Sequence, residues 1–240
     1  MSSATFAPPQ YGVFSMAPMI RWVIASPVPM LERGAANPIP ILGRRNAASA
    51  SPTFDRILHH HMGLHDLEKP LVKADHDHAL DTWQWVLELD PQAGLAVQVA
   101  ALFHDVERLD SEANARIEHR APDYQSFKDN HALQGALVTA RALGVVGLPP
   151  LEVVHVTDLV AGHERPLARG EAALLADADV LSFFSCNIDG FLRCYGPSHT
   201  QLKIAWSMRR LRPHAVRLIE RIRFERDVAL LVAAELGSSR

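Results

Sequence analysis

The segment Ala100-Ala-Leu-Phe-His-Asp-Val-Glu-Arg108 places an adjacent histidine and aspartate, His104 and Asp105, at the polar end of an apolar run. Packing alone gives a core helix no reason to end in this way. Imidazole nitrogen and carboxylate oxygen are ligands for divalent iron, manganese, zinc or nickel, and neighbouring residues converge on one ion only where the backbone leaves regular helix geometry. The segment therefore predicts a helix that ends at a pair of metal ligands.

Apolar periodicity predicts helices on both sides of this segment. Leu80, Trp83 and Val86, for example, recur close to a 3.6-residue period. The predicted helices span about 79–89, 92–103, 129–144, 150–162 and 171–184, followed by a turn-rich stretch at 190–197 and a pair at 200–211 and 213–236. Asp129 and Gly144 are the expected caps of the third helix. Because no convincing period-two strand interrupts them, we predict an all-α domain over 55–240, with about five core helices and a C-terminal helical pair.

The composition limits the partners that the chain can have. Its 240 residues, 48% of them apolar, are enough to bury a sizeable core. A balance of 24 basic and 27 acidic side chains lacks the positive excess that binding to extended nucleic acid needs. No stretch of about 18 residues is apolar throughout, which argues against a membrane-spanning helix. Two cysteines are too few for a disulfide scaffold, so a cytoplasmic protein is expected.

Residues 1–54 differ in composition from the rest of the chain. They contain half of the 16 prolines, many alanines and serines, and one acidic residue, Glu32, against four arginines. Such a segment is a poor candidate for packed structure, so we expect a disordered extension. An organellar targeting peptide is the alternative.

Two further polar residues fall where the periodicity predicts burial. His78 opens the helix before the His104-Asp105 pair, and Asp179 lies in the apolar run Leu174-Leu-Ala-Asp-Ala-Asp-Val-Leu181. An unpaired buried carboxylate costs several kcal/mol, whereas one shared cation accounts for all four residues. We therefore predict that these side chains bind a divalent ion of manganese, iron, cobalt, nickel, zinc or magnesium.

The order of these residues resembles the HD-domain superfamily of metal-dependent phosphohydrolases over about residues 70–185. In that family a ligand histidine begins the helix before the doublet, the doublet follows an Ala-Leu-Leu-like run, and the last aspartate has an Ala-Asp-x-Leu context. Here these elements read Asp77-His78-Ala-Leu, Ala101-Leu-Phe-His-Asp105 and Ala178-Asp-Val-Leu181. The last context favours Asp179 over Asp177, and helical phase favours His78 over His76. Asp177 and His76 stay open as alternative ligands.

Two more histidines match positions at which many HD proteins bind a second metal or a phosphate oxygen. His131 begins a His-x-x-x-Gly-Ala helix start, and His163 closes the next predicted helix. The resemblance implies that both are metal ligands and catalytic residues beside Asp105, in a site of one or two ions. His155, two turns before His163, is expected to pack instead.

The residues that follow the doublet suggest a phosphate contact. Arg108 lies three residues after Asp105, where related enzymes often place a phosphate-binding side chain, and a guanidinium holds phosphate through two parallel bonds. Glu107 is one position short of the glutamate that some nucleotidases of the superfamily use. A general acid or base and a solvated side chain are therefore equal alternatives for Glu107.

Two other polar clusters are expected to lie on the surface. The run His59-His60-His61 with His65 has no cysteine to complete a closed zinc site. A C-terminal basic cluster is expected to be a charged helix face, with substrate contact as the alternative; it consists of Lys203, Arg209, Arg210 and Arg212 beside Trp206.

The resemblance implies a hydrolase that cleaves a phosphate ester of a nucleotide or another small phosphorylated metabolite. Asp105 would be the central ligand of an ion that lowers the pKa of water towards neutrality, and Arg108 or a histidine would steady the phosphoryl oxygens. Two other functions fit the same residues. One is an HD-type oxygenase with a dinuclear iron centre, and the other is a nucleotide-binding sensor without turnover.

Overall fold

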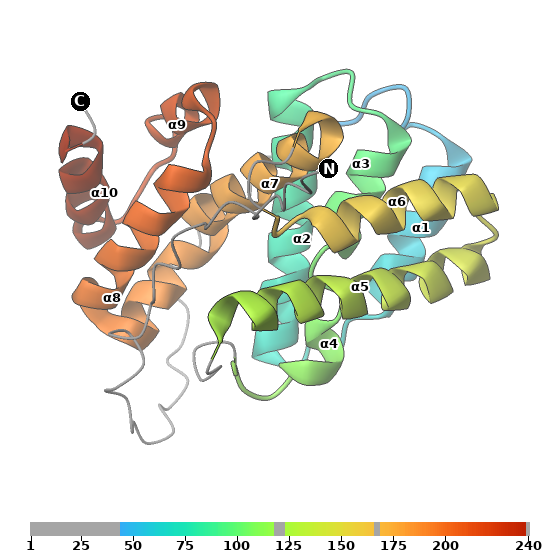
Figure 1. The fold of residues 1–240 in the computed structure, drawn as a ribbon, viewed down its shortest axis with the longest axis horizontal. Helices are drawn as coiled ribbons and strands as arrows, with labels where there is room; N and C mark the ends of the chain where they lie inside the picture. The colour runs from blue at the N-terminus through green and yellow to red at the C-terminus, as the bar shows by residue number, and fades with distance from the viewer. Residues whose placement is uncertain (1–43, 118–122, 166–168, 239–240) are drawn as a thin grey trace, which may run out of the picture.

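The computed structural model describes residues 44–117, 123–165 and 169–238, and every regular element within these ranges is a helix (Figure 1). The predicted all-α fold is confirmed for this part of the chain. The helices are α1 (Pro52–Gly63), α2 (Pro70–Leu89), α3 (Leu95–Phe103), α4 (Arg108–Ser111), α5 (Tyr124–Val146), α6 (Pro150–Gly162), α7 (Gly170–Ser182), the π-helix η3 (Phe183–Asn187), α8 (Ile188–Arg210), α9 (Pro213–Ile219) and α10 (Arg226–Ser238). None of them is both long and apolar enough to cross a bilayer.

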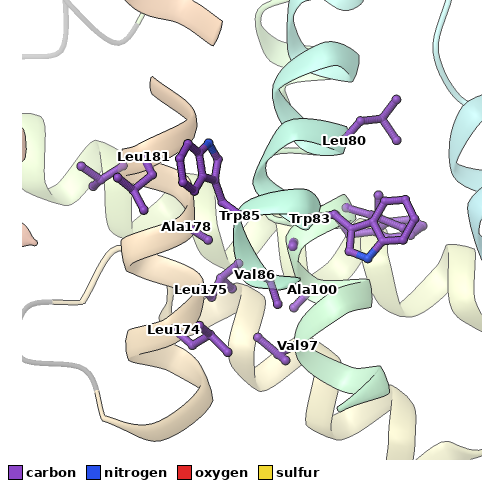
Figure 2. Packing of buried hydrophobic residues seen from close by; sticks show 14 of the residues in the cluster. Leu80, Trp83, Trp85, Val86, Val97, Ala100, Leu174, Leu175, Ala178 and Leu181 are labelled. Atoms are coloured by element: carbon purple, nitrogen blue, oxygen red, sulfur yellow. The ribbon is translucent and has the colours of Figure 1, made fainter. Parts of the chain in front are cut away.

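The core is built around α2, which is buried along most of its length. Figure 2 shows Trp85 on the α7 side of α2 and Trp83 on the opposite side, with Val86 pointing towards α3 and α7. Because neighbours cover α2 on several sides, its polar groups need internal partners. The indole N–H of Trp83 donates to Gln98 at 2.9 Å, and that of Trp85 donates to Asp81 at 3.1 Å.

The boundaries of the helices differ from the sequence prediction at several points. α2 begins at Pro70 rather than near residue 79. α5 begins at Tyr124, because Asp123, not Asp129, caps it by accepting a hydrogen bond from the Ser126 N–H. It runs past Gly144 to Gly147, whose φ of 79° is the left-handed conformation that glycine adopts most readily.

The C-terminal part is more helical, and more divided, than predicted. The stretch 190–197 is not a loop, since it lies within α8, which is kinked at Gly196 (φ 75°) just before Pro197. The predicted final helix over 213–236 is wrong as a single element, because it consists of α9 and α10 with a break between them. In Figure 1, α8, α9 and α10 form a group on one side of α7, away from α1.

The expected disordered extension lies mostly outside the described residues, but residues 44–54 are described and make contacts with the rest of the fold. Asn46 donates from its side chain to the carbonyls of Pro91 and Ala93 and accepts from Gln98. Phe54 is fully buried against Trp83. The folded part therefore begins before residue 54.

A close approach between α5 and the end of α3 depends on Gly135. A Cβ atom at this position would lie 3.2 Å from the His104 carbonyl oxygen and 3.5 Å from a methyl group of Val160. Both are atoms of the packed interior. The missing side chain lets α5 bring His131, one turn earlier, close to Asp105.

We expect Gly135→Val to lower the free energy of unfolding by about 1–3 kcal/mol, because the added methyl groups overpack this contact. Gly144→Ala in the same helix is the matched control, since a Cβ there meets nothing within 4 Å. That control should leave stability unchanged or raise it by up to about 1 kcal/mol. Urea unfolding measures both, and equal stability of the Gly135→Val protein and the parent would contradict the packing argument.

Candidate metal centre

Three of the predicted ligands meet where α2, α3 and α7 come together. His78, His104 and Asp179 each offer a donor atom, and these atoms all lie within 4.8 Å of one another. The Nε2 atoms of the two histidines are 3.2 Å apart, and His78 Nε2 is 3.1 Å from Asp179 Oδ1. The three residues come from helices that pack directly on one another, so the core holds the group in place.

The hydrogen bonds of the two rings fix which nitrogens carry protons. His104 Nδ1 lies 2.9 Å from the Ala101 carbonyl and must donate to it. The Ser182 hydroxyl donates to the His78 carbonyl, so it accepts from His78 Nδ1 at 2.8 Å. In the neutral rings both Nε2 atoms are then unprotonated and their lone pairs face each other. This arrangement is repulsive unless a cation or a proton lies between them.

A second group of donors lies beside the first. Asp105, His131 and His163 also have donor atoms within 4.8 Å of one another. His131 Nε2 is 2.8 Å from Asp105 Oδ1, and His163 Nε2 is 3.8 Å from the same oxygen. His163 Nδ1 donates to the Val160 carbonyl at 2.7 Å, which leaves its buried Nε2 without a hydrogen-bond partner. An unpartnered imidazole nitrogen that faces a carboxylate is a typical metal ligand.

Asp105 joins the two groups. Its Oδ2 atom lies 4.0 Å from His78 Nε2 and 3.8 Å from His104 Nε2, while Oδ1 faces His131 and His163. The combined set of four imidazoles and two carboxylates suits divalent manganese, iron, cobalt, nickel or zinc better than magnesium, which prefers oxygen ligands. The donor chemistry therefore fits one or two bound cations that share Asp105.

Charged side chains outside the two groups orient the donors. Glu107 accepts a hydrogen bond from His131 Nδ1 at 2.6 Å, which turns the other ring nitrogen towards Asp105. Arg108 Nε lies 3.0 Å from Asp105 Oδ2, and its Nη1 atom donates to Glu112 at 2.8 Å. Glu107 is thus held by His131 rather than free in solvent, and it does not contact Asp105. Arg108 lies beside Asp105.

The charges inside the metal-free centre shift the pKa values of its members. Burial alone lowers the pKa of His104, but the Asp105 and Asp179 carboxylates outweigh it and raise that pKa to about 9. Burial raises the pKa of Asp105, yet Arg108 and His104 hold it well below its usual range. The pKa of Asp179 is also held well below normal against burial, by His104 and His78. The metal-free centre thus keeps a proton that a cation would displace.

The alternatives to these ligands have other partners. Asp177 is buried but binds Arg212, through the backbone N–H at 3.2 Å and the guanidinium Nε at 2.5 Å. His76 lies among other histidines rather than in either donor group. His155, which we expected to pack, is half exposed and contacts Glu171 at 2.7 Å.

The C-terminal basic cluster is paired rather than being a simple charged face. Arg210 binds Glu164, next to His163, at 3.1 Å, and Arg212 binds Asp177. Lys203 and Arg210 both lie over the ring of Trp206. These interactions attach α8 and the start of α9 to the helices that carry the two donor groups.

One expectation about the histidine run is wrong. His61 is fully buried and His65 is 9% exposed, so neither is a surface residue. The burial of His61 could have been predicted from its spacing. Phe54, Ile57 and His61 recur at helical spacing on the buried face of α1, although a run of histidines looks polar.

Comparisons with known proteins give a family and no activity. A family model described as Domain of unknown function (DUF4202) matches residues 53–232, well over half of the chain. No curated protein and no solved structure matches. The matched range contains every residue of both donor groups. Its description names no metal or reaction, so the resemblance to the HD-domain superfamily depends on the histidine and aspartate pattern alone.

We expect Asp179→Asn to abolish binding of one divalent cation, because it removes the carboxylate that faces both His78 and His104. Asp177→Asn, two residues earlier, should keep the full metal content and lose stability instead, since it weakens the buried pair with Arg212. Metal analysis after dialysis against Mn²⁺ or Zn²⁺ distinguishes the two variants. The opposite pattern would move the ligand assignment to Asp177.

The stability of the metal-free protein should fall as pH rises from 6.5 to 9. His104 has a pKa of about 9 in the folded state against 6.5 when unfolded, so its contribution is complete below pH 6.5 and is lost as the pH passes 9. The loss is about 3 kcal/mol at most. Chelator-treated protein unfolded in urea across this range tests the slope, which His104→Gln should flatten. A flat profile for the parent protein would contradict the proposed protonation.

Proposed function

The chain belongs to the DUF4202 family, and we propose that it is a metal-dependent phosphohydrolase that acts on a nucleotide or another small phosphorylated metabolite. The observation that carries the proposal is the pair of buried Nε2 lone pairs of His78 and His104, 3.2 Å apart and beside two carboxylates. Neutral packing does not account for this repulsion in a buried core. A proton on His104 or a divalent cation between the rings relieves it, and a divalent cation would also make the centre chemically active.

The ligands proposed for the cation are the members of the two donor groups: His78, His104 and Asp179 on one side, His131 and His163 on the other, and Asp105 between them. A bound divalent ion would supply Lewis acidity, which lowers the pKa of water and neutralises charge on a phosphoryl oxygen. Asp105, held ionised by Arg108, accepts hydrogen bonds at the centre and orients the attacking water. His131, with Glu107 behind it, holds a proton at Nδ1.

Arg108 supports phosphate as the substrate group. It puts a permanent positive charge beside the shared carboxylate, and Glu112 and Asp105 hold its planar guanidinium in a fixed orientation. Because Asp105 and Glu112 engage its Nε and Nη1 atoms, Arg108 would favour a phosphate group mainly through its charge. With divalent cations bound, positive charge at the centre exceeds the charge of its carboxylates and favours an anionic substrate.

One observation favours a second function. Asp105 faces both donor groups with different oxygens, and this is an arrangement suited to two metal ions that share a carboxylate. With iron in both positions, such a centre would support oxygen activation, so a dinuclear-iron oxygenase is the competing proposal. Iron content with oxygen consumption would support it, whereas phosphate release without oxygen supports the hydrolase.

We expect the purified protein to release phosphate from at least one phosphate ester in a screen with added Mn²⁺, Co²⁺, Ni²⁺ or Fe²⁺ under anaerobic conditions. His104→Ala should lower turnover by at least about 100-fold and weaken metal binding at the centre around Asp105, because it removes a buried ligand. His155→Ala is the control, since this half-exposed residue lies outside both donor groups. Unchanged phosphate release by the His104→Ala protein would refute the proposal.

A further inference from the structure

A second set of buried histidines lies apart from the two donor groups. It consists of His61 at the end of α1, His65 in the following turn and His76 in α2. The ring centroids of His61 and His65 are 4.4 Å apart, those of His65 and His76 5.1 Å, and those of His61 and His76 6.1 Å. We call them the outer histidine cluster. His76 precedes His78 by two residues, and two residues turn a helix by about 200°, so the two side chains leave α2 in nearly opposite directions.

The rings of the outer histidine cluster have polar atoms without partners. Neither ring nitrogen of His61 has a hydrogen bond of good geometry, although the Leu102 backbone lies near enough to raise the pKa of the ring, and His76 Nε2 has no partner either. The exposed fractions of the side chains are small: His61 is 0% and His76 6% exposed. A buried polar atom without a partner loses the hydrogen bond that it would make with water. Packing against Phe103, whose ring lies 5.0 Å from that of His61, does not need imidazole and would be served as well by an apolar ring.

The other nitrogens of the cluster are oriented as those of metal-binding imidazoles usually are. His65 Nδ1 donates to the His61 carbonyl at 2.8 Å, which leaves Nε2 as the unprotonated atom. His76 Nδ1 faces the Asp77 carboxylate at 3.4 Å. An imidazole whose second nitrogen bonds a carbonyl or carboxylate is held in the tautomer that binds a cation. Burial, followed by the neighbouring His65 and His76, lowers the pKa of His61 well below normal, so this ring is neutral at pH 7.

The spacing of the rings matches a tetrahedral ion. With zinc–nitrogen bonds of 2.0–2.1 Å and tetrahedral angles, three bound imidazoles have centroids about 5 Å apart. The observed separations lie around this value. The nitrogens themselves do not form a third tight donor group among the described residues. At least one ring must therefore rotate about its Cβ–Cγ bond, a motion that exchanges carbon and nitrogen positions and leaves the ring centroid nearly in place.

We propose that His61, His65 and His76 form a second metal site that takes Zn²⁺ or a similar borderline ion such as Co²⁺. His65, at 9% exposure, is the most accessible of the three. The bound ion satisfies the orphan nitrogens and joins the end of α1 to α2. The inference does not depend on the activity proposed for the centre around Asp105.

The test is the stoichiometry of Zn²⁺ bound to the full chain after equilibrium dialysis, with Co²⁺ absorption as a report of tetrahedral coordination. His65→Gln should bind one Zn²⁺ fewer than the parent protein and should lose the tetrahedral Co²⁺ bands of this site. His61→Gln should do the same. Because His65 is at the edge of the cluster, its variant carries the test if His61→Gln fails to fold, as judged by circular dichroism.

His59→Gln is the matched control, because His59 is exposed and belongs to the same run of histidines. It should bind as much Zn²⁺ as the parent. Loss of the same equivalent in His59→Gln would show chelation by the exposed histidine and overturn the proposal, as would full Zn²⁺ binding by His65→Gln. His104→Ala should keep the ion at the outer cluster, so failure of the central site and failure of this one give different results.

Discussion

The buried contact between the Nε2 atoms of His78 and His104 is the constraint on which the rest of the structure depends. Apolar helices could pack more favourably without it, because burying two imidazoles beside two carboxylates costs free energy that packing does not return. The fold keeps the contact by holding the Nδ1 atom of each ring. The Ser182 hydroxyl binds Nδ1 of His78, and the Ala101 carbonyl binds Nδ1 of His104. Such preorganisation is what a site needs when it must hold a cation in one geometry.

The surrounding helices supply complementary parts of this arrangement. α2, α3 and α7 carry the first donor group, and α5 and the end of α6 bring His131 and His163 to Asp105 from the other side. The break in helix geometry after Phe103 allows His104 and Asp105, which are adjacent in sequence, to serve the same centre. A continuous helix would separate their side chains by about 100°.

The sequence was sufficient to predict the all-α fold and the six side chains that the structure brings together. The fold came from helical periodicity and four of the six side chains from polar residues near apolar runs, whereas His131 and His163 came from the resemblance to the HD-domain superfamily. The caps of α5 were missed because Asp123 and Asp129 are both good N-cap residues, and tertiary contacts decide between them. The burial of His61 was missed because a run of adjacent histidines reads as polar, although only one of them falls on the apolar face of α1. The partners of Asp177 and Glu164 could not be predicted, since they come from residues more than 30 positions away.

The ion pair between Asp177 and Arg212 has a consequence for the architecture of this chain. It ties the helix that carries Asp179 to the first residues after α8, and the neighbouring contact of Arg210 with Glu164 does the same for the segment that carries His163. The C-terminal helices are therefore attached to the segments that carry Asp179 and His163 and help to hold them in position. A fragment cut before Arg210 would leave the buried Asp177 carboxylate without Arg212, and loss of metal by that fragment would say nothing about which residues coordinate the ion.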